Sequence, residues 1–196
     1  CNAESAMAFA LGGRLDNDLK QQKVAANLMD FVYFDSDLYR SDPSSPTYGL
    51  LGWFSYRSGP NSVWGNDGSK AVIGSFTTAA ALHNSRWDER ILTSILANFR
   101  TTGPMGFRDG MPLSTRALNQ HGWEYFAARR SIAPWPQREA WAWACYLWLY
   151  DKTRYEPLLE QARNALRMTM ERYPDGWGYA LNEMQMERGR ILLPLA

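Results

Sequence analysis

The sequence of 196 residues contains few of the side chains that most often build metal centres and disulfide frameworks. Its two cysteines, Cys1 and Cys145, are too few for a disulfide framework. Its two histidines, His83 and His121, lie far apart in the sequence, and His83 falls in a predicted turn. We therefore expect no histidine-based metal site, no Ser-His-Asp triad and no cofactor.

The chain also lacks an excess of charge of either sign and a long apolar run. Lysine and arginine together number 21 and aspartate and glutamate 20, which gives a formal net charge of +1. Because no basic run stands out, we do not expect nucleic acid to be the main partner. No apolar run reaches the roughly 20 residues that a membrane-spanning helix needs, so we expect no membrane insertion.

Aromatic residues, by contrast, are plentiful. They make up 14% of the chain and include nine tryptophans. A chain of this length can form one domain with a sizeable core, which we place at residues 1–196. Helix packing absorbs many large rings, and Cys145 in its apolar surroundings reads as a small buried hydrophobe. Tryptophans in loops beside carboxylates have a different meaning, because sugar rings stack on their faces.

A repeated pattern of a turn followed by an amphipathic helix indicates the architecture. Arg14, Arg86 and Arg154 occupy equivalent turns, and each is followed by apolar residues at the spacing of a one-sided surface helix. The helices before these turns are of another kind. Residues 139–150 are apolar all round, and residues 69–82 are rich in small residues that let neighbouring helices approach closely. The alternation predicts an all-α fold of the α/α toroid type, with inner helices covered by outer ones.

We expect inner helices near residues 2–11, 68–83, 137–150 and 181–196. Outer helices are expected near residues 17–33, 86–101 and 155–172. Long connections over residues 34–66 and 102–136 precede the second and third inner helices, and residues 114–129 are expected to form a short helix. Strand signals are weak, although the connections have room for a hairpin.

In such an arrangement the inner helices all begin at the same face, and candidate site residues gather at these beginnings. They are Glu4 in the first helix; Trp64, Asn66 and Asp67 in the second; Trp135, Arg138 and Glu139 in the third; and Trp177 and Glu187 in the fourth. The turns at the opposite face hold Gly, His, Asn and Arg, which are ordinary turn residues. This asymmetry predicts one cavity lined by carboxylates, amides and tryptophans, a lining that suits polyols. Trp53, in the first long connection, is a further candidate platform for a sugar ring.

Each carboxylate also has a structural interpretation. Asp67 or Asn66 suits a helix cap. Glu139 suits an ion pair with Arg138 or another arginine, and Glu187 suits ion pairs with the arginines that follow it. From the sequence alone, both interpretations stay open.

Four segments of the chain resemble a group of bacterial proteins in the six-hairpin glycosidase superfamily. They are Trp64-Gly-Asn-Asp-Gly-Ser-Lys-Ala71, Ser85-Arg-Trp-Asp88, residues 96–108 and residues 133–148. The resemblance implies an (α/α)6 toroid with a carbohydrate-binding funnel, and hydrolysis by paired carboxylates in the characterised branches. In that group a second acid often follows the position of Asp67, and an aromatic residue or histidine occurs near the position of Arg138. Here Gly68 and Arg138 stand instead.

The resemblance therefore suggests a glycoside hydrolase that acts on a poly- or oligosaccharide, in the periplasm or the cytoplasm of a bacterium. Glycosidic cleavage needs one protonated carboxyl group and one carboxylate. Asp67, at a helix N-terminus, suits the base or nucleophile. Glu139 or Glu187, in more apolar surroundings, suits the acid, and Glu4 is the reserve.

Other functions stay open beside this one. The same fold suits a non-catalytic glycan-binding or assembly module, and also a sugar epimerase or a polysaccharide lyase. The helices expected here are fewer than an (α/α)6 barrel contains. We therefore expect an incomplete barrel, with residues 1–196 forming part of a longer chain whose remainder closes the ring.

Overall fold

The computed structural model describes residues 2–53, 62–63, 65–108, 113–177 and 183–195, and this part of the chain is all-α with very little strand. Its helices are α1 (Asn2–Leu15), α2 (Leu19–Asp30), α3 (Gly65–Leu82), α4 (Asp88–Arg100), α5 (Thr115–Ala127), α6 (Pro136–Thr153), α7 (Glu156–Glu171) and α8 (Glu183–Ile191). A π-helical turn, Phe31–Asp35, continues α2, and a 3-10 turn, Leu193–Leu195, follows α8. The expected all-α class is thus confirmed.

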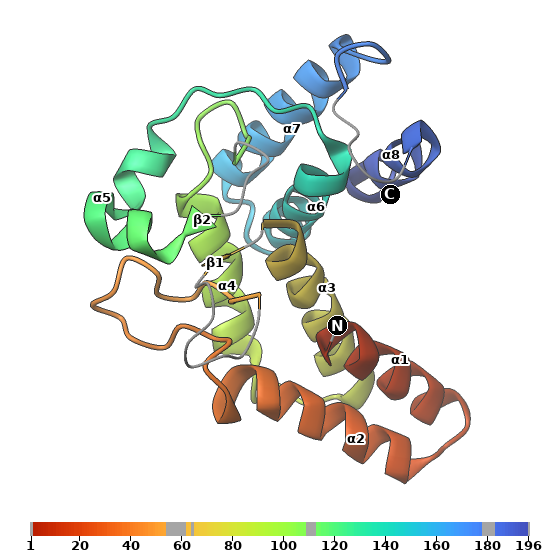
Figure 1. Cartoon of the computed structure of the whole chain (residues 1–196). Coiled ribbons are helices and arrows are strands. Elements are labelled where there is room, and N and C mark those ends of the chain that lie inside the picture. Colours follow the sequence, from red (N-terminus) through yellow and green to blue (C-terminus); the bar gives the residue numbers. More distant parts are fainter. Residues whose placement is uncertain (1, 54–61, 64, 109–112, 178–182, 196) are drawn as a thin grey trace.

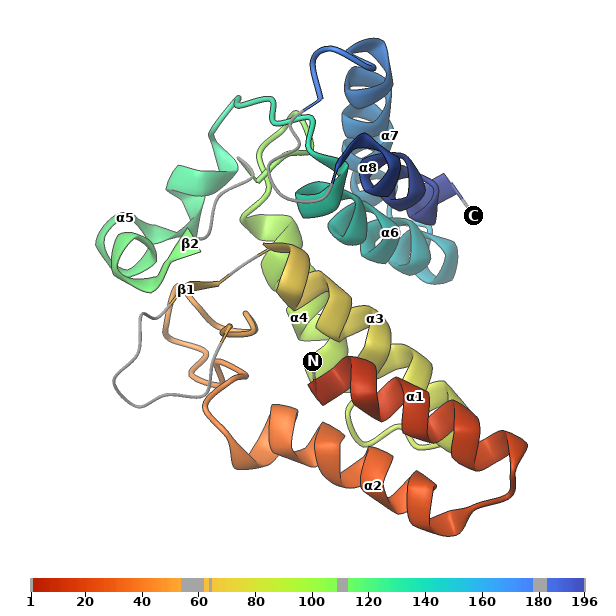
Figure 2. The same ribbon diagram turned by 45° about the vertical axis from the view of Figure 1, so that its right-hand side comes forward.

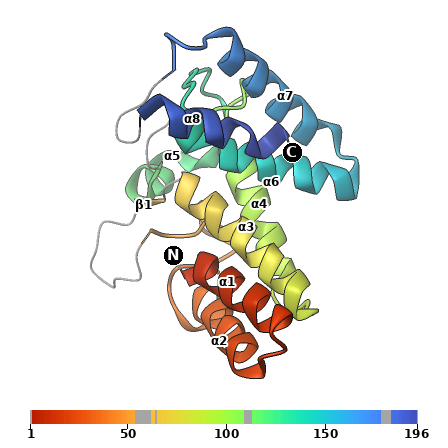
Figure 3. The same cartoon turned by 90° about the vertical axis from the view of Figure 1, so that its right-hand side faces the viewer.

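The helices form antiparallel hairpins that stand side by side (Figure 1). Helices α1, α3, α6 and α8 follow one another as neighbours in a row, and the views in Figures 2 and 3 show them running in the same direction. Helix α2 packs on α1, α4 packs on α3 and α6, and α7 packs on α6. The helices expected to be inner thus lie in one row, and the helices expected to be outer pack against this row.

The start of α2 explains a difference between the expected and observed ends of α1. The pair Gly12-Gly13 suggested a turn after residue 11, but α1 continues through both glycines to Leu15. A Cβ added at Gly13 would lie 2.9 Å from the carbonyl oxygen of Asp18, in the turn that leads into α2. The glycine at residue 13 therefore allows this turn to approach α1 closely. Asp18 then caps α2 by accepting a bond from the backbone N–H of Lys20 at 2.8 Å.

Helix α3 shows the close packing that its small residues predict. A Cβ added at Gly74 would lie 2.7 Å from the carbonyl oxygen of Ala3, so the backbones of α1 and α3 almost touch there. Ala3 and Ala6 are buried in the same contact region. The position of α1 along α3 therefore depends on a glycine at residue 74.

Helix α6 forms the centre of the main core. Between residues 136 and 150 every side chain is buried or partly buried, as expected for a helix that is apolar all round. Trp143 is fully buried and donates its indole N–H to the carbonyl oxygen of Gly106 at 2.7 Å. Cys145 is also buried, and desolvation raises the pKa of its thiol far above the usual value, so this cysteine is a packing residue.

The two long connections contain the little strand that the described residues show. Tyr39 and Leu51 form an antiparallel bridge, so the first connection folds back on itself. The strands β1 (Ser62–Val63) and β2 (Leu113–Ser114) pair antiparallel and join the first connection to the second. Helix α5 in the second connection lies where a short helix was expected, and Gly122 (φ 76°) kinks it.

Two glycines of α3 provide a matched test of the contact between α1 and α3. We expect Gly74→Ala to lower the free energy of unfolding by about 1–3 kcal/mol, because the new methyl group would overlap the backbone of α1. Gly68→Ala should be neutral or slightly stabilising, because its nearest neighbour would be the Leu51 carbonyl oxygen at 3.9 Å. Urea unfolding of both variants measures the difference. Equal stability of the two variants would show that α1 does not depend on this contact.

Candidate functional site

A cavity of about 380 Å³ opens at the start of α1 and α3, and we call it the Asp67 cavity. It is lined by Asn2, Ala3 and Glu4 of α1, Phe31 and Val32 at the end of α2, Leu38, Leu51, Gly52 and Trp53 of the first connection, and Asp67, Gly68, Lys70 and Ala71 of α3. It thus brings together three of the predicted site residues, Glu4, Trp53 and Asp67. Its volume is in the range of small-molecule sites.

The carboxylates of this cavity come from two different helices. Glu4 lies in the first turn of α1 and Asp67 in the first turn of α3. The Asp67 side chain is 38% exposed, and its Oδ1 lies 3.7 Å from the Nζ of Lys70. A ligand in the cavity therefore meets acceptor oxygens from Glu4 and Asp67 together with the donor group of Lys70.

Trp53 gives the cavity an aromatic wall. Its side chain is 46% exposed, so part of the indole is accessible to a ligand. The backbone around it is held in place, because Trp53 donates its N–H to Ser62 at 3.2 Å and Gly52 donates to Leu38 at 2.8 Å. An exposed indole on a fixed backbone beside carboxylates is the arrangement that the sequence predicts for sugar stacking.

Lys70 is a lining residue that the sequence analysis did not single out. The spacing of Asp67 and Lys70 could have indicated that Lys70 lies beside Asp67, because residues three apart share one face of a helix. Lys70 also lies over the ring of Trp141, 5.4 Å from its centroid, which links the cavity to α6.

Glu139 is positioned differently, because its carboxylate lies inside the protein. The side chain is 1% exposed, and both of its oxygens accept from the backbone N–H of Arg108, at 3.1 and 3.2 Å. The guanidinium of Arg108, itself 5% exposed, donates through Nη1 to the side-chain oxygen of Asn98 in α4. Glu139 thus contributes to a buried polar junction of α4, α6 and the second connection, and it does not line the Asp67 cavity.

The same junction extends to the beginning of α3. A Cβ added at Gly65 would lie 2.7 Å from the Cζ of Arg108, so the guanidinium packs directly against the first residue of that helix. Asp67 and Glu139 therefore lie at the same end of the row of helices, as predicted. Asn66 follows Gly65, and its buried Oδ1 has no hydrogen-bond partner among the described residues, so it accepts none of their N–H groups as a cap of α3 would.

Glu187 holds the beginning of α6 to α8. Its Oε2 accepts from the backbone N–H of Gln137 at 2.6 Å, and the side chain is fully buried. Desolvation raises the pKa of this carboxyl group, while the Gln137 N–H and the nearby Arg190 and Arg138 oppose the shift. A raised pKa is the property expected of a general acid. However, Glu187 is outside the lining of the Asp67 cavity.

The remaining predicted tryptophans are in varied positions. Trp135 is partly buried, and Arg138 lies over its ring at 4.5 Å from the centroid, so these two predicted binding residues contact each other. Trp177 is 4% exposed and donates its indole N–H to Thr169 at 2.6 Å. Its ring is therefore part of the core, which corrects its prediction as a sugar platform. Trp64 lies outside the described residues.

Comparison with known proteins does not add to this description. No protein-family model, curated protein or solved structure matches the chain. Among the described residues, no helix is long and apolar enough to span a membrane. The same residues contain no group of three or more His, Cys, Asp or Glu side chains suited to a metal ion.

The raised pKa of Glu187 predicts a pH dependence of stability. Because the folded protein binds this proton more tightly than the unfolded chain, the contribution of Glu187 is fully present below the unfolded pKa, near 4.5, and is lost as pH rises through the higher folded pKa. We expect Glu187→Gln to remove this decline, because the neutral amide can still accept from Gln137. Thermal unfolding of both proteins from pH 4 to pH 8 measures the difference. Parallel curves for the two proteins would contradict the burial of an ionisable group at this position.

Proposed function

We propose that the protein binds a carbohydrate in the Asp67 cavity and that it is a glycoside hydrolase. The observation that carries the proposal is the lining, in which Glu4 and Asp67 from two helices face the same space as the exposed indole of Trp53. Hydroxyl groups of a sugar both donate and accept, so they match carboxylate oxygens and the Lys70 ammonium. The flat apolar face of a sugar ring matches the indole.

The proposed architecture is the α/α toroid. The row of α1, α3, α6 and α8, with α2, α4 and α7 packed on it, supports an arc of such a ring. In a toroid the beginnings of the inner helices surround one funnel, and further helices would close the ring around it. The position of the Asp67 cavity at the beginning of two of these helices agrees with a funnel.

In the hydrolytic mechanism, Asp67 acts as base or nucleophile, because its carboxylate lies in the first turn of α3 beside Lys70. The second carboxyl group of the cavity, Glu4, is the acid that protonates the leaving oxygen. Glu139 and Glu187 have supporting roles, because each already accepts a backbone N–H away from the cavity. These buried carboxylates fix the beginnings of the helices that carry the site.

A non-catalytic glycan-binding module is the second candidate. The positions of Glu139 and Glu187 outside the lining favour this candidate, because they leave only Glu4 and Asp67 as carboxylates in the cavity. If these two groups do not flank a glycosidic bond, the cavity binds a sugar without cleaving it. Both candidates predict that the sugar binds, and only the hydrolase predicts that it is cleaved.

The experiment separates binding from turnover. Calorimetric titration with a panel of neutral, amino and acidic oligosaccharides measures binding, and release of reducing ends measures hydrolysis. We expect Trp53→Ala to weaken binding about tenfold, or about 1.4 kcal/mol. Trp123→Ala is the matched control, because Trp123 is a comparably exposed tryptophan on α5 (36%, against 46% for Trp53) outside the cavity lining.

The carboxylates distinguish the two candidates. For a hydrolase, Asp67→Asn and Glu4→Gln each abolish reducing-end release while sugar still binds. For a binding module, the wild-type protein binds the sugar and releases no reducing ends. Failure of every sugar in the panel to bind, or equal loss of affinity in the Trp53 and Trp123 variants, would overturn both.

A further inference from the structure

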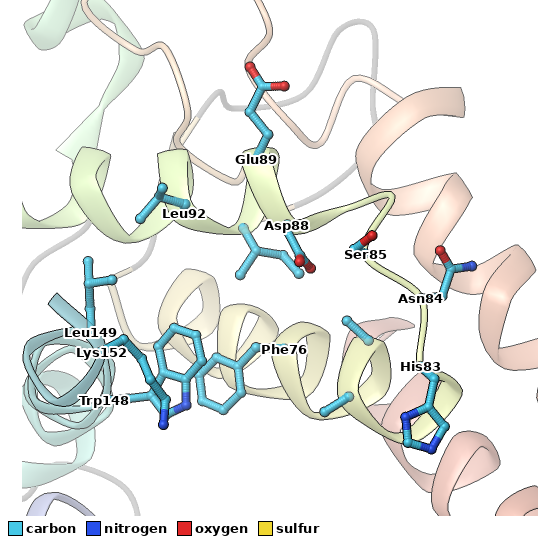
Figure 4. A pocket seen from close by; sticks show the side chains of 13 residues that line it. Phe76, His83, Asn84, Ser85, Asp88, Glu89, Leu92, Trp148, Leu149 and Lys152 are labelled. Carbon is cyan, nitrogen blue, oxygen red and sulfur yellow. The ribbon is translucent and has the colours of Figure 1, made fainter.

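A second and larger cavity opens at the other end of α3, and we call it the Phe76 cavity (Figure 4). Its volume is about 660 Å³. It is lined by Phe76, Ala79, Ala80, His83, Asn84 and Ser85 of α3 and the following turn, by Asp88, Glu89, Ile91 and Leu92 of α4, and by Trp148, Leu149 and Lys152 of α6. It shares no lining residue with the Asp67 cavity.

One wall of this cavity is aromatic. Phe76 of α3 and Trp148 of α6 stack with their ring centroids 4.3 Å apart and their planes 4° from parallel. Both side chains are partly buried and pack on the main core, so the stack is held at its rear. Ile91, Leu92 and Leu149 add aliphatic surface. The cavity can therefore hold an apolar, flat body of a ligand.

The charge at the rim of this cavity is negative. Asp88 and Glu89 are exposed at the beginning of α4, and neither carboxylate has an ion-pair partner in the described part of the chain. The two arginines that flank these carboxylates in the sequence contact other groups. Arg86 lies 3.0 Å from Asp30, and Arg90 lies over the ring of Phe34.

Two other titratable groups line the Phe76 cavity, and neither neutralises these carboxylates. Lys152, on the α6 side, has its Nζ 3.0 Å from Asp151, and no ion pair joins it to Asp88 or Glu89 in the described part of the chain. His83 is exposed in the turn after α3. Figure 4 shows the Asp88 carboxylate directed toward the space between α4 and α3, whereas Glu89 extends from the other side of α4.

We propose that the Phe76 cavity binds a small organic amine, with its ammonium group at Asp88 and its flat apolar body on the Phe76–Trp148 stack. An ammonium group forms a charge-assisted hydrogen bond with a carboxylate. An aromatic body beside the stack buries apolar surface and gains ring–ring contacts. The cavity volume is in the range of sites that take ligands of this size. This site is separate from the proposed carbohydrate site and does not depend on it.

The test uses three ligands that share one ring and differ in charge. They are 2-phenylethylamine, 2-phenylethanol and 3-phenylpropionate, titrated into the protein and followed by calorimetry and by protein-observed NMR. We expect saturable binding with the amine about tenfold tighter than the alcohol, and the carboxylate weakest. Equal affinity for the three ligands, or no saturable binding of the amine, would overturn the proposal.

Neighbouring carboxylates supply the matched variants. Asp88→Asn should remove the preference for the amine, whereas Glu89→Gln, whose carboxylate extends from the other side of α4 than Asp88, should keep it. Phe76→Leu should weaken all three ligands, because it removes half of the aromatic stack. Thermal unfolding confirms that each variant is folded. If Asp88→Asn binds the amine as the wild type does, Asp88 is not the anchor and the proposal is wrong.

Discussion

The arrangement of the site depends on one buried cation, the guanidinium of Arg108. It bonds to Asn98 of α4 and packs against Gly65 at the beginning of α3, while its own backbone N–H binds Glu139 of α6. A buried polar group left without its hydrogen-bond partner typically costs about 1–3 kcal/mol, and more when the group is charged. Because Arg108 contacts three helices at once, the beginnings of α3 and α6 are fixed relative to each other, and with them Asp67 and the entry to its cavity.

A second constraint acts along α3 and is steric. Gly74 lets α1 approach so closely that Glu4 of α1 and Asp67 of α3 can line one cavity. Further along the same helix, Phe76 stacks on Trp148 of α6. The two cavities open at opposite ends of α3.

Most helices of this chain could be predicted from its periodicity, because α4 and α7 bury an apolar stripe and α6 is buried nearly all round. Two errors have physical reasons. Gly12 and Gly13 read as a turn, whereas they lie inside α1, and Gly13 makes room for the backbone before α2. Trp177 read as a loop tryptophan beside an acid, yet its N–H bonds to Thr169 and its ring is buried. A sequence pattern locates glycines and rings, but which backbone they contact is a property of the packed structure.

The same limit applies to the candidate sites. Asp67 and Glu4 were found because carboxylates occur near helix beginnings, which share a face in a hairpin array. Trp53 was found as an aromatic residue of the first long connection. Glu139 and Glu187 fit the same pattern, but their oxygens accept backbone N–H groups. No local pattern separates a carboxylate that lines a cavity from one that satisfies a neighbouring backbone. No sequence pattern indicates the Phe76 cavity, because Phe76 and Trp148 come together only through the contact between α3 and α6.

The charges of the two cavities point to different ligands. In the Asp67 cavity a lysine lies beside an aspartate, so the lining offers both donors and acceptors and suits a ligand rich in hydroxyl groups. In the Phe76 cavity the lysine is paired outward with Asp151, and the arginines next to Asp88 are engaged with Asp30 and Phe34. A carboxylate without a partner next to an apolar wall favours a ligand that combines a cation with an apolar body. Both ends of α3 carry carboxylates and aromatic rings. The difference between the two proposed ligands therefore depends on which group each neighbouring lysine or arginine contacts.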